Sequence, residues 1–218
     1  MSTPAPADPS RRRLVVMDVD STLITCEVIE LLAGHAGSRD VVAAITDRAM
    51  HGEIDFATSL HERVATLAGL PAGVLDVVRA EIELTPGARE LIDELHRRGW
   101  PVGVVSGGFA EVVGPLAASL GIRHVRANHL EVRGGVLTGR VRGPVVDRAA
   151  KESALREYAE LERIDLADTV AIGDGANDLA MLAAAGFGVA FNAKPLVREL
   201  ADAAVDGRLD AVLALLDG

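Results

Sequence analysis

The feature that most constrains the fold of this chain is a series of short apolar runs that alternate with helix-like segments after residue 86. The run Leu14–Met17 is of the same kind, and it ends abruptly at Asp18. Short runs containing β-branched residues are typical of buried parallel strands. Strands that alternate with helices predict a parallel sheet that binds ligands beyond the carboxyl ends of its strands. We therefore predict an α/β fold with a Rossmann-like core.

Apolar spacing and Gly or Pro punctuation place the other elements of this core. The predicted strands cover residues 101–105, 169–172, 188–191 and 203–205, with a hairpin over 125–141 that turns at Gly134-Gly135. The predicted helices cover residues 87–98, 110–120, 147–163, 179–185, 195–200 and 209–216.

A different pattern occupies the segment from Thr25 to about Ala80, where apolar residues keep helical spacing throughout. This block of roughly 55 residues is short for an independent domain. We predict a helical cap over residues 25–81, inserted between two parts of the core at 13–24 and 82–218. Residues 1–12 begin with a Pro-rich stretch that cannot bury surface, so we expect a disordered leader. The run Arg11–Arg13 is expected to be a solvated approach to the first strand.

Composition excludes several classes of partner. Lys and Arg total 22 against 32 Asp and Glu, a net charge of −10, which argues against nucleic acid and anionic membrane surfaces. No apolar run approaches the roughly 20 residues of a membrane span, and no secretory signal is seen. The single cysteine, Cys26, permits no intrachain disulfide and no cysteine zinc cage. We expect a cytoplasmic protein that acts on a small molecule. The oligomeric state stays open, with a homodimer among the alternatives.

Polar clusters follow three of the predicted strands. They are Asp18-Val19-Asp20-Ser21-Thr22, Ser106-Gly107-Gly108, and Gly173-Asp174-Gly175 with Asn177-Asp178. Four carboxylates at one sheet edge destabilise one another unless a cation or a proton intervenes. Oxygen ligands without His or Cys favour Mg²⁺, and the glycines leave backbone amides open to an anion. With Lys151 as a positive charge near a helix start, these features indicate a phosphoryl site.

The spacing of Asp18 and Asp20 separates a hydrolase from a phosphate-accepting switch. Residues two apart on a strand point the same way, so both carboxylates can face one crevice. One can attack phosphorus, and the other can protonate the leaving oxygen and later take a proton from water. The second aspartate therefore favours hydrolysis.

The motifs resemble those of the haloacid dehalogenase superfamily of phosphohydrolases. MDVDSTLI resembles the first motif, VVSGG the second and GDGANDLAML the fourth, while Lys151 stands where the third falls. The string HGEIDFATSLHERVATLAGL is similar to the cap of members that hydrolyse O-phospho-L-serine to L-serine and phosphate, the last step of serine biosynthesis. The resemblance extends over nearly the whole chain after residue 12.

The resemblance implies a role for each core residue. Asp18 is then the nucleophile that forms an aspartyl-phosphate, and Asp20 is the general acid and base. Mg²⁺ is held by the side chains of Asp18 and Asp174 and by the main-chain carbonyl of Asp20, with Asp178 supporting the site from behind. The implied phosphate contacts are Ser106, the Gly107 amide and Lys151, with Asn177 near the phosphate.

The resemblance also implies cap contacts: Glu27 with the substrate ammonium, Arg63 with its carboxylate, and Met50 and Phe56 along the cap side. Independently, a selective pocket for phosphoserine needs an anion and a guanidinium of this kind. The sequence alone does not show that Glu27 and Arg63 converge. Met50 and Phe56 can also be read as cap core.

Alternatives remain open at this stage. A phosphatase or phosphotransferase acting on another small amino-alcohol phosphate would use the same motifs, and a receiver-like phosphoacceptor would share the acidic pocket. Glu152 follows Lys151 where related sequences often have a small residue. Lys194, in NAKP, competes with Lys151 for the place of the phosphate-side lysine.

Overall fold

The structure, a computed structural model, describes residues 12–217. Its strands are β1 (Leu14–Met17), β2 (Val102–Phe109), β3 (His124–Arg133), β4 (Val136–Arg142), β5 (Thr169–Gly173), β6 (Phe187–Phe191) and β7 (Ala203–Val205). Its helices are α1 (Val28–Ala36), α2 (Arg39–Met50), α3 (Phe56–Ala65), α4 (Val74–Glu81), α5 (Ala88–Arg97), α6 (Ala110–Ser119), α7 (Arg148–Glu162), α8 (Leu179–Ala184), α9 (Pro195–Leu200) and α10 (Val212–Leu216).

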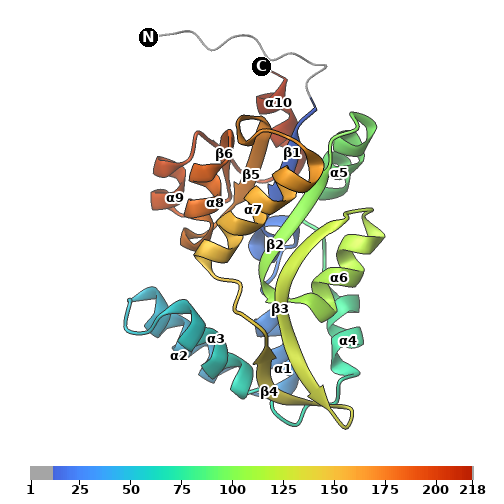
Figure 1. The fold of residues 1–218 in the computed structure, drawn as a ribbon. Helices are drawn as coiled ribbons and strands as arrows, with labels where there is room; N and C mark the ends of the chain where they lie inside the picture. The colour runs from blue at the N-terminus through green and yellow to red at the C-terminus, as the bar shows by residue number, and fades with distance from the viewer. Residues whose placement is uncertain (1–11, 218) are drawn as a thin grey trace.

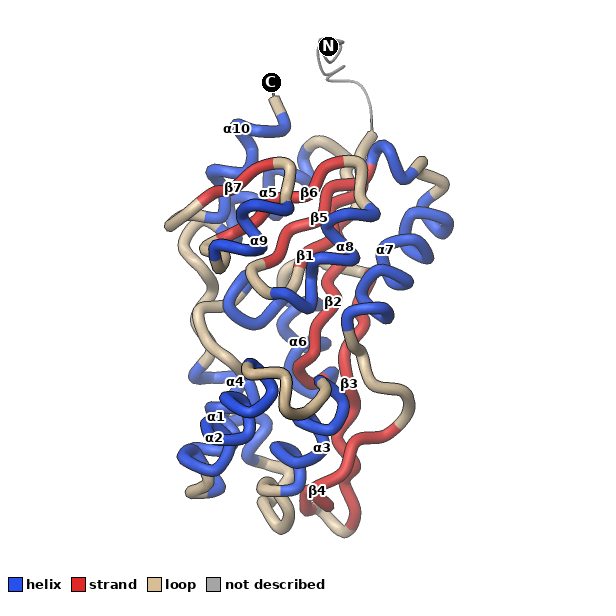
Figure 2. Tube along the Cα trace, turned by 90° about the vertical axis from the view of Figure 1, so that its left-hand side faces the viewer, coloured by secondary structure: helices blue, strands red, loops and turns tan. Residues whose placement is uncertain are grey.

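These strands form one sheet in the order β4-β3-β2-β1-β5-β6-β7 (Figures 1 and 2). Every pairing is parallel except that of β3 with β4, which are antiparallel and joined by the predicted glycine turn. The chain order reverses beside β1, since its neighbours are β2 on one side and β5 on the other. Such a switch point leaves a crevice at the carboxyl ends of the strands. The predicted α/β fold with a Rossmann-like sheet is confirmed.

Both faces of the sheet are covered because β1 and its neighbours are apolar on both sides. Leu14 and Val16 pack with α7, α8 and α9 on one face. Val15 and Met17 belong to the larger cluster on the other face, with α5, α6 and α10. Alternate side chains of a strand point to opposite faces, so an uninterrupted apolar run requires a layer of helices on each side.

Helices α1 to α4 gather at one end of the molecule, beyond the carboxyl edge of the sheet (Figure 1). The two connections to this helical segment lie side by side, through an antiparallel bridge between Ile24 and Leu84. Thr85 N donates to the Leu23 carbonyl at 3.0 Å, which extends the pairing. Apolar side chains of α1, α3 and α4 share one cluster with a face of the sheet, so helical segment and sheet are packed through a common core.

The structure differs from several of the sequence expectations, and residues 51–54 between α2 and α3 are turn and bend where helical spacing is expected. Residues 66–73 are turns rather than helix, and the hairpin packs there: Leu137 N donates to the Leu70 carbonyl at 2.8 Å. Strand β2 continues past the expected end at Val105 to Phe109, with irregular register against β3. The guanidinium of Arg13 stacks over the Trp100 ring at 5.3 Å, so it is not merely solvated.

The leader expected over residues 1–12 lies outside the described residues except for Arg12, whose side chain pairs with Glu162. Within residues 12–217, no helix is both long and apolar enough to cross a bilayer.

Candidate active site

Asp18 and Asp20 leave β1 at the centre of the sheet. The Asp18 amide donates to the Ile172 carbonyl of β5 at 2.9 Å, which is the last bond before the chain turns away. The turn passes through Ser21, whose φ of 58° is left-handed, and Ser21 Oγ donates to Glu27 Oε1 at 2.7 Å. Asp18 is 3% exposed and Asp20 is 9% exposed, so both carboxylates are removed from bulk water.

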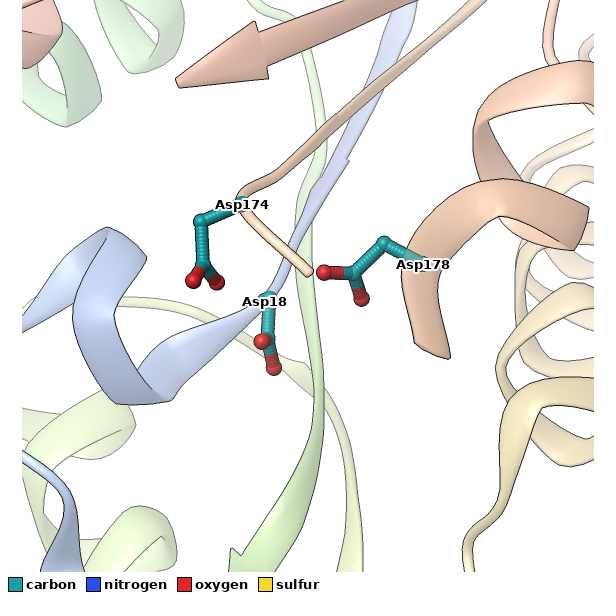
Figure 3. A group of neighbouring side chains, drawn as sticks. All are labelled: Asp18, Asp174 and Asp178. Atoms are coloured by element: carbon teal, nitrogen blue, oxygen red, sulfur yellow. The ribbon is translucent and has the colours of Figure 1, made fainter. Parts of the chain in front are cut away.

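A second pair of carboxylates follows the adjacent strand, β5. Asp174 comes directly after the strand, and Asp178 lies one short turn later, where its Oδ2 accepts from Gly175 N at 3.0 Å. The backbone here needs glycine: a Cβ on Gly173 would lie 2.5 Å from Asp178 Cγ. Figure 3 shows the side chains of Asp18, Asp174 and Asp178 grouped beside the ends of β1 and β5, and one carboxylate oxygen of each lies within 4.8 Å of the other two.

Lys151 of α7 supplies the positive charge beside this acidic group. Its side chain is 1% exposed, and its Nζ lies 2.7 Å from both Asp18 Oδ1 and Asp178 Oδ1. Burial by itself would lower the pKa of Lys151, but the charges of Asp178 and Asp18 outweigh it and the pKa is raised. Lys151 is therefore held as a cation and fixes two carboxylates through charge.

One lysine does not neutralise the group, and the pKa values of the aspartates show this. Burial, then the Asp178 charge, raises the pKa of Asp18 well above its ordinary value. Burial and the same charge raise the pKa of Asp174 to about 6. Burial and the Glu27 charge raise the pKa of Asp20 to about 6. A carboxyl group with a pKa near 6 is suited to both giving and taking a proton near neutral pH.

Hydrogen bonds orient Asp20 toward β2. Its Oδ1 accepts from Val28 N, the first residue of α1, at 2.8 Å, and its Oδ2 accepts from Ser106 Oγ at 3.0 Å. Ser106 Oγ in turn accepts from Gly108 N at 2.7 Å. A Cβ on Gly108 would lie 2.6 Å from Asp20 Oδ2, so glycine allows this approach. The irregular end of β2 thus serves to bring Ser106 to Asp20.

The donor set fits a hard divalent cation. Asp18 Oδ1 is buried, and although Lys151 is near, no described donor meets it with hydrogen-bond geometry. Both oxygens of Asp178 are already occupied, by Lys151 and Gly175. Among residues 12–217, the hydrogen bond to Asp174 comes from Thr22 Oγ1 and is long, at 3.3 Å. The residues best able to hold a metal are therefore Asp18 and Asp174, and all-oxygen ligands suit Mg²⁺.

A cavity of about 740 Å³ opens above these carboxylates, between the sheet edge and α1 to α3. Of the sequence-predicted site residues, the cavity is lined by Asp18, Asp20, Glu27, Met50, Phe56, Arg63, Gly107, Asp174 and Asn177. Ser106, Lys151 and Asp178 are fully buried and lie behind its wall. Met50 is 64% exposed and lies at the rim.

Arg63 and Glu27, which are far apart in the sequence, converge on this cavity. Arg63 Nε donates to the Ser59 carbonyl at 3.3 Å, and no described residue pairs with its terminal nitrogens. Burial lowers the pKa of Arg63, and nearby acidic charges, Glu27 first, oppose that effect. A guanidinium desolvated in this way is suited to bind a carboxylate.

Sequence reasoning missed the role of Asn128. This buried residue of β3 donates from Nδ2 to the Gly107 carbonyl at 2.8 Å and accepts from Val146 N at 2.8 Å. It thereby ties the end of β2 to the segment that leads into α7 and Lys151. The sequence feature that could have indicated this role is a single Asn within the alternating run 125–141. Arg148 also lines the cavity and was not singled out.

Comparisons with known proteins agree with this arrangement. The family model of the haloacid dehalogenase-like hydrolases matches residues 15–183. The chain is 62% identical over 206 residues to a phosphoserine phosphatase of Streptomyces coelicolor, covering 94% of this chain and 50% of that protein. It is 51% identical over 205 residues to a phosphoserine phosphatase of Lactococcus lactis, covering 94% of this chain and 95% of that protein.

Solved structures show the same similarity. One, described as a phospho-aspartyl intermediate analogue of phosphoserine phosphatase, has a TM-score of 0.89 at 42% identity and covers 94% of this chain and 99% of that one. The chain spans about half the length of its curated relatives from Streptomyces coelicolor and Mycobacterium tuberculosis.

Proposed function

Because this chain belongs to the haloacid dehalogenase-like hydrolases, we propose that it is a Mg²⁺-dependent phosphatase that hydrolyses O-phospho-L-serine to L-serine and phosphate. The observation that carries the proposal is the convergence of two sets of residues on one cavity. Asp18, Asp20 and Asp174 lie at the sheet edge, and Glu27 and Arg63 lie in the helical segment. The first set suits phosphoryl transfer and the second suits an amino acid.

The reaction takes two steps. A carboxylate oxygen of Asp18 attacks phosphorus, and the bond from phosphorus to the seryl oxygen breaks as Asp20 gives that oxygen a proton. Water then attacks the aspartyl-phosphate while Asp20 takes its proton, and phosphate leaves with Asp18 restored. Lys151 holds Asp18 in place throughout.

The proposed metal ligands are the side chains of Asp18 and Asp174 and the main-chain carbonyl of Asp20. Bound there, Mg²⁺ would neutralise charge on the carboxylates and the phosphoryl oxygens. Ser106, the Gly107 amide and Lys151 are proposed to hold the phosphate, with Asn177 beside it and Asp178 behind. The chain is proposed to comprise a core over 13–24 and 82–218 and a cap over 25–81.

Glu27 and Arg63 are proposed to select the substrate, with Met50 and Phe56 along the cap side. The ammonium of phosphoserine would lie at Glu27 and its carboxylate at Arg63. A role in the last step of serine biosynthesis and a cytoplasmic location are parts of the same proposal.

The test is release of phosphate from a panel of small phosphorylated amines and acids, with Mg²⁺ and with EDTA. O-phospho-L-serine should be the best substrate, and EDTA should stop turnover until Mg²⁺ is restored. Arg63→Ala should raise KM for phosphoserine roughly 10- to 150-fold, as expected for lost hydrogen bonds to a charged group. It should leave phosphoethanolamine, which has no carboxylate, nearly unchanged. Equal effects on both substrates would remove Arg63 from the carboxylate role.

A further inference from the structure

Lysine is rare in this chain, and its two lysine residues lie near the candidate site. The sequence has only Lys151 and Lys194 among its 22 basic residues. Lys151 is buried against Asp18 and Asp178, whereas Lys194 is exposed and lines the cavity. The two lysines therefore occupy different positions, Lys151 within the buried acidic cluster and Lys194 at the exposed lining of the cavity.

The backbone holds Lys194 in a defined position. It follows β6, the strand next to β5 and Asp174, and its carbonyl accepts from Val197 N at 3.0 Å at the start of α9. Asn192, two residues earlier, donates from its main-chain amide to the Val205 carbonyl and accepts from Gly207 N with its Oδ1. Lys194 is thus presented from an anchored turn at the carboxyl edge of the sheet.

The charge of Lys194 is not neutralised by a described residue. Lys194 Nζ lies 3.9 Å from the sulfur of Met50, which belongs to the helical segment on the other side of the cavity mouth. A thioether is a weak acceptor and carries no charge. Arg148, exposed at the first position of α7, lines the same cavity and likewise has no ion pair among residues 12–217. Two cations at this mouth therefore lack an anion.

An anionic substrate needs such charges to reach the site. The chain carries a net charge of −10, and the acidic residues that line the cavity are Asp18, Asp20, Glu27, Glu30 and Asp174. A phosphate dianion that approaches the cavity is repelled by the net negative charge of the chain and by the acidic residues of the cavity lining. Positive charge at the rim offsets the repulsion locally and raises the concentration of phosphorylated molecules at the mouth.

We propose that Lys194, together with Arg148, forms an outer capture site that binds the phosphate group of the incoming substrate before it reaches Asp18. The inference rests on the proposed function and extends it to two residues outside the reaction centre. One unit charge acting on a dianion at roughly 10 Å in water changes its local concentration about fourfold. That interaction is screened once the Debye length falls to about 3 Å at 1 M salt.

The first experiment measures kinetics with O-phospho-L-serine in Lys194→Gln, Arg148→Gln and the double variant. Each single change should lower kcat/KM about threefold to fivefold at low salt, leave kcat nearly unchanged, and lose its effect near 1 M salt. Lys194→Arg should behave like the unmodified chain. Arg89→Gln is the matched control, since Arg89 is exposed on α5, lies outside the cavity lining and forms no ion pair within the described part of the chain. Equal effects of Arg89→Gln and Lys194→Gln, or effects that persist at 1 M salt, would overturn the proposal.

The second experiment needs no turnover. An amine-specific reagent should label Lys194 but not Lys151, which serves as an internal control because it is buried. Inorganic phosphate should slow labelling of Lys194, measured by peptide mass spectrometry, and Arg148→Gln should weaken that protection. If inorganic phosphate leaves the rate of Lys194 labelling unchanged, the proposed capture site is wrong. If protection is seen but no phosphoserine is hydrolysed, the proposed function fails while the anion site stands.

Discussion

Replacing Lys151 with methionine tests the charge balance of the buried cluster. The side chains of Lys151, Asp18 and Asp178 are 1%, 5% and 0% exposed, and both ion-pair distances are 2.7 Å. Methionine nearly preserves the length and removes the charge. Breaking a buried pair by removing one partner costs about 3–5 kcal/mol, because the remaining charge has no compensation. In a chain of this length, that loss lowers Tm by roughly 6–20 °C.

The assay is thermal and urea unfolding in the presence of EDTA, so that no metal replaces the lost cation. Glu152→Gln is the matched control, because Glu152 is the next residue of α7 and its ion pair with Arg156 is solvent-exposed. The control should lose less than about 0.5 kcal/mol. Adding Asp178→Asn to Lys151→Met should recover part of the loss, since the second change removes the uncompensated carboxylate.

The loss should depend on pH. Without Lys151, the folded-state pKa of Asp18, already raised by burial, rises further above its unfolded value. A carboxyl group with a raised folded pKa contributes stability below its unfolded pKa and loses it as pH rises. The variant should therefore be closest to the unmodified chain at pH 4–5 and furthest from it at neutral pH. A loss below about 1 kcal/mol at pH 7, or a further loss on adding Asp178→Asn, would refute this electrostatic account.

Three other predictions concern the site and its surroundings. Asp18→Asn should abolish phosphoenzyme formation, detected by acid quench with labelled substrate; full turnover in this variant would contradict the proposed role of Asp18 as nucleophile. Burial raises the pKa of Cys26 to about 11, so its alkylation by iodoacetamide should be slow at pH 8. The free energy of unfolding should fall as pH rises above 9, because the thiol then ionises in the unfolded chain and not in the folded one. Alkylation at the rate of free cysteine would contradict the burial of the Cys26 thiol. Gly173→Ala should lose roughly 1–3 kcal/mol, since its Cβ would strike Asp178. Gly73→Ala, which has open space around its Cβ and an ordinary φ of −60°, should change the free energy of unfolding by less than about 0.5 kcal/mol. Similar changes in urea unfolding for the two variants would be inconsistent with the steric reason.

Much of the core could be predicted because its signals are local. The four apolar residues before Asp18 predict a strand buried on both faces, and the alternation that follows predicts parallel pairing. The boundaries that failed depend on distant partners. The end of β2 continues to Phe109, where Gly108 N donates to Ser106 Oγ and Ser106 Oγ donates to Asp20, a residue of the turn after β1. Residues 66–73 are turns because the hairpin of a later segment pairs with them.

The sequence by itself determined the chemical inventory: paired aspartates after one apolar run, a second acidic cluster after another, glycines beside both, and a lysine in a later helix. These follow from residue type and short spacing, which local backbone preferences express directly. Only the tertiary structure decided that Glu27 and Arg63 share a cavity, that Asn128 joins β2 to the approach to α7, and that Lys151 is buried while Lys194 is exposed. Those outcomes depend on how the sheet order and the helical segment bring distant residues together, because burial and charge pairing are properties of the packed molecule.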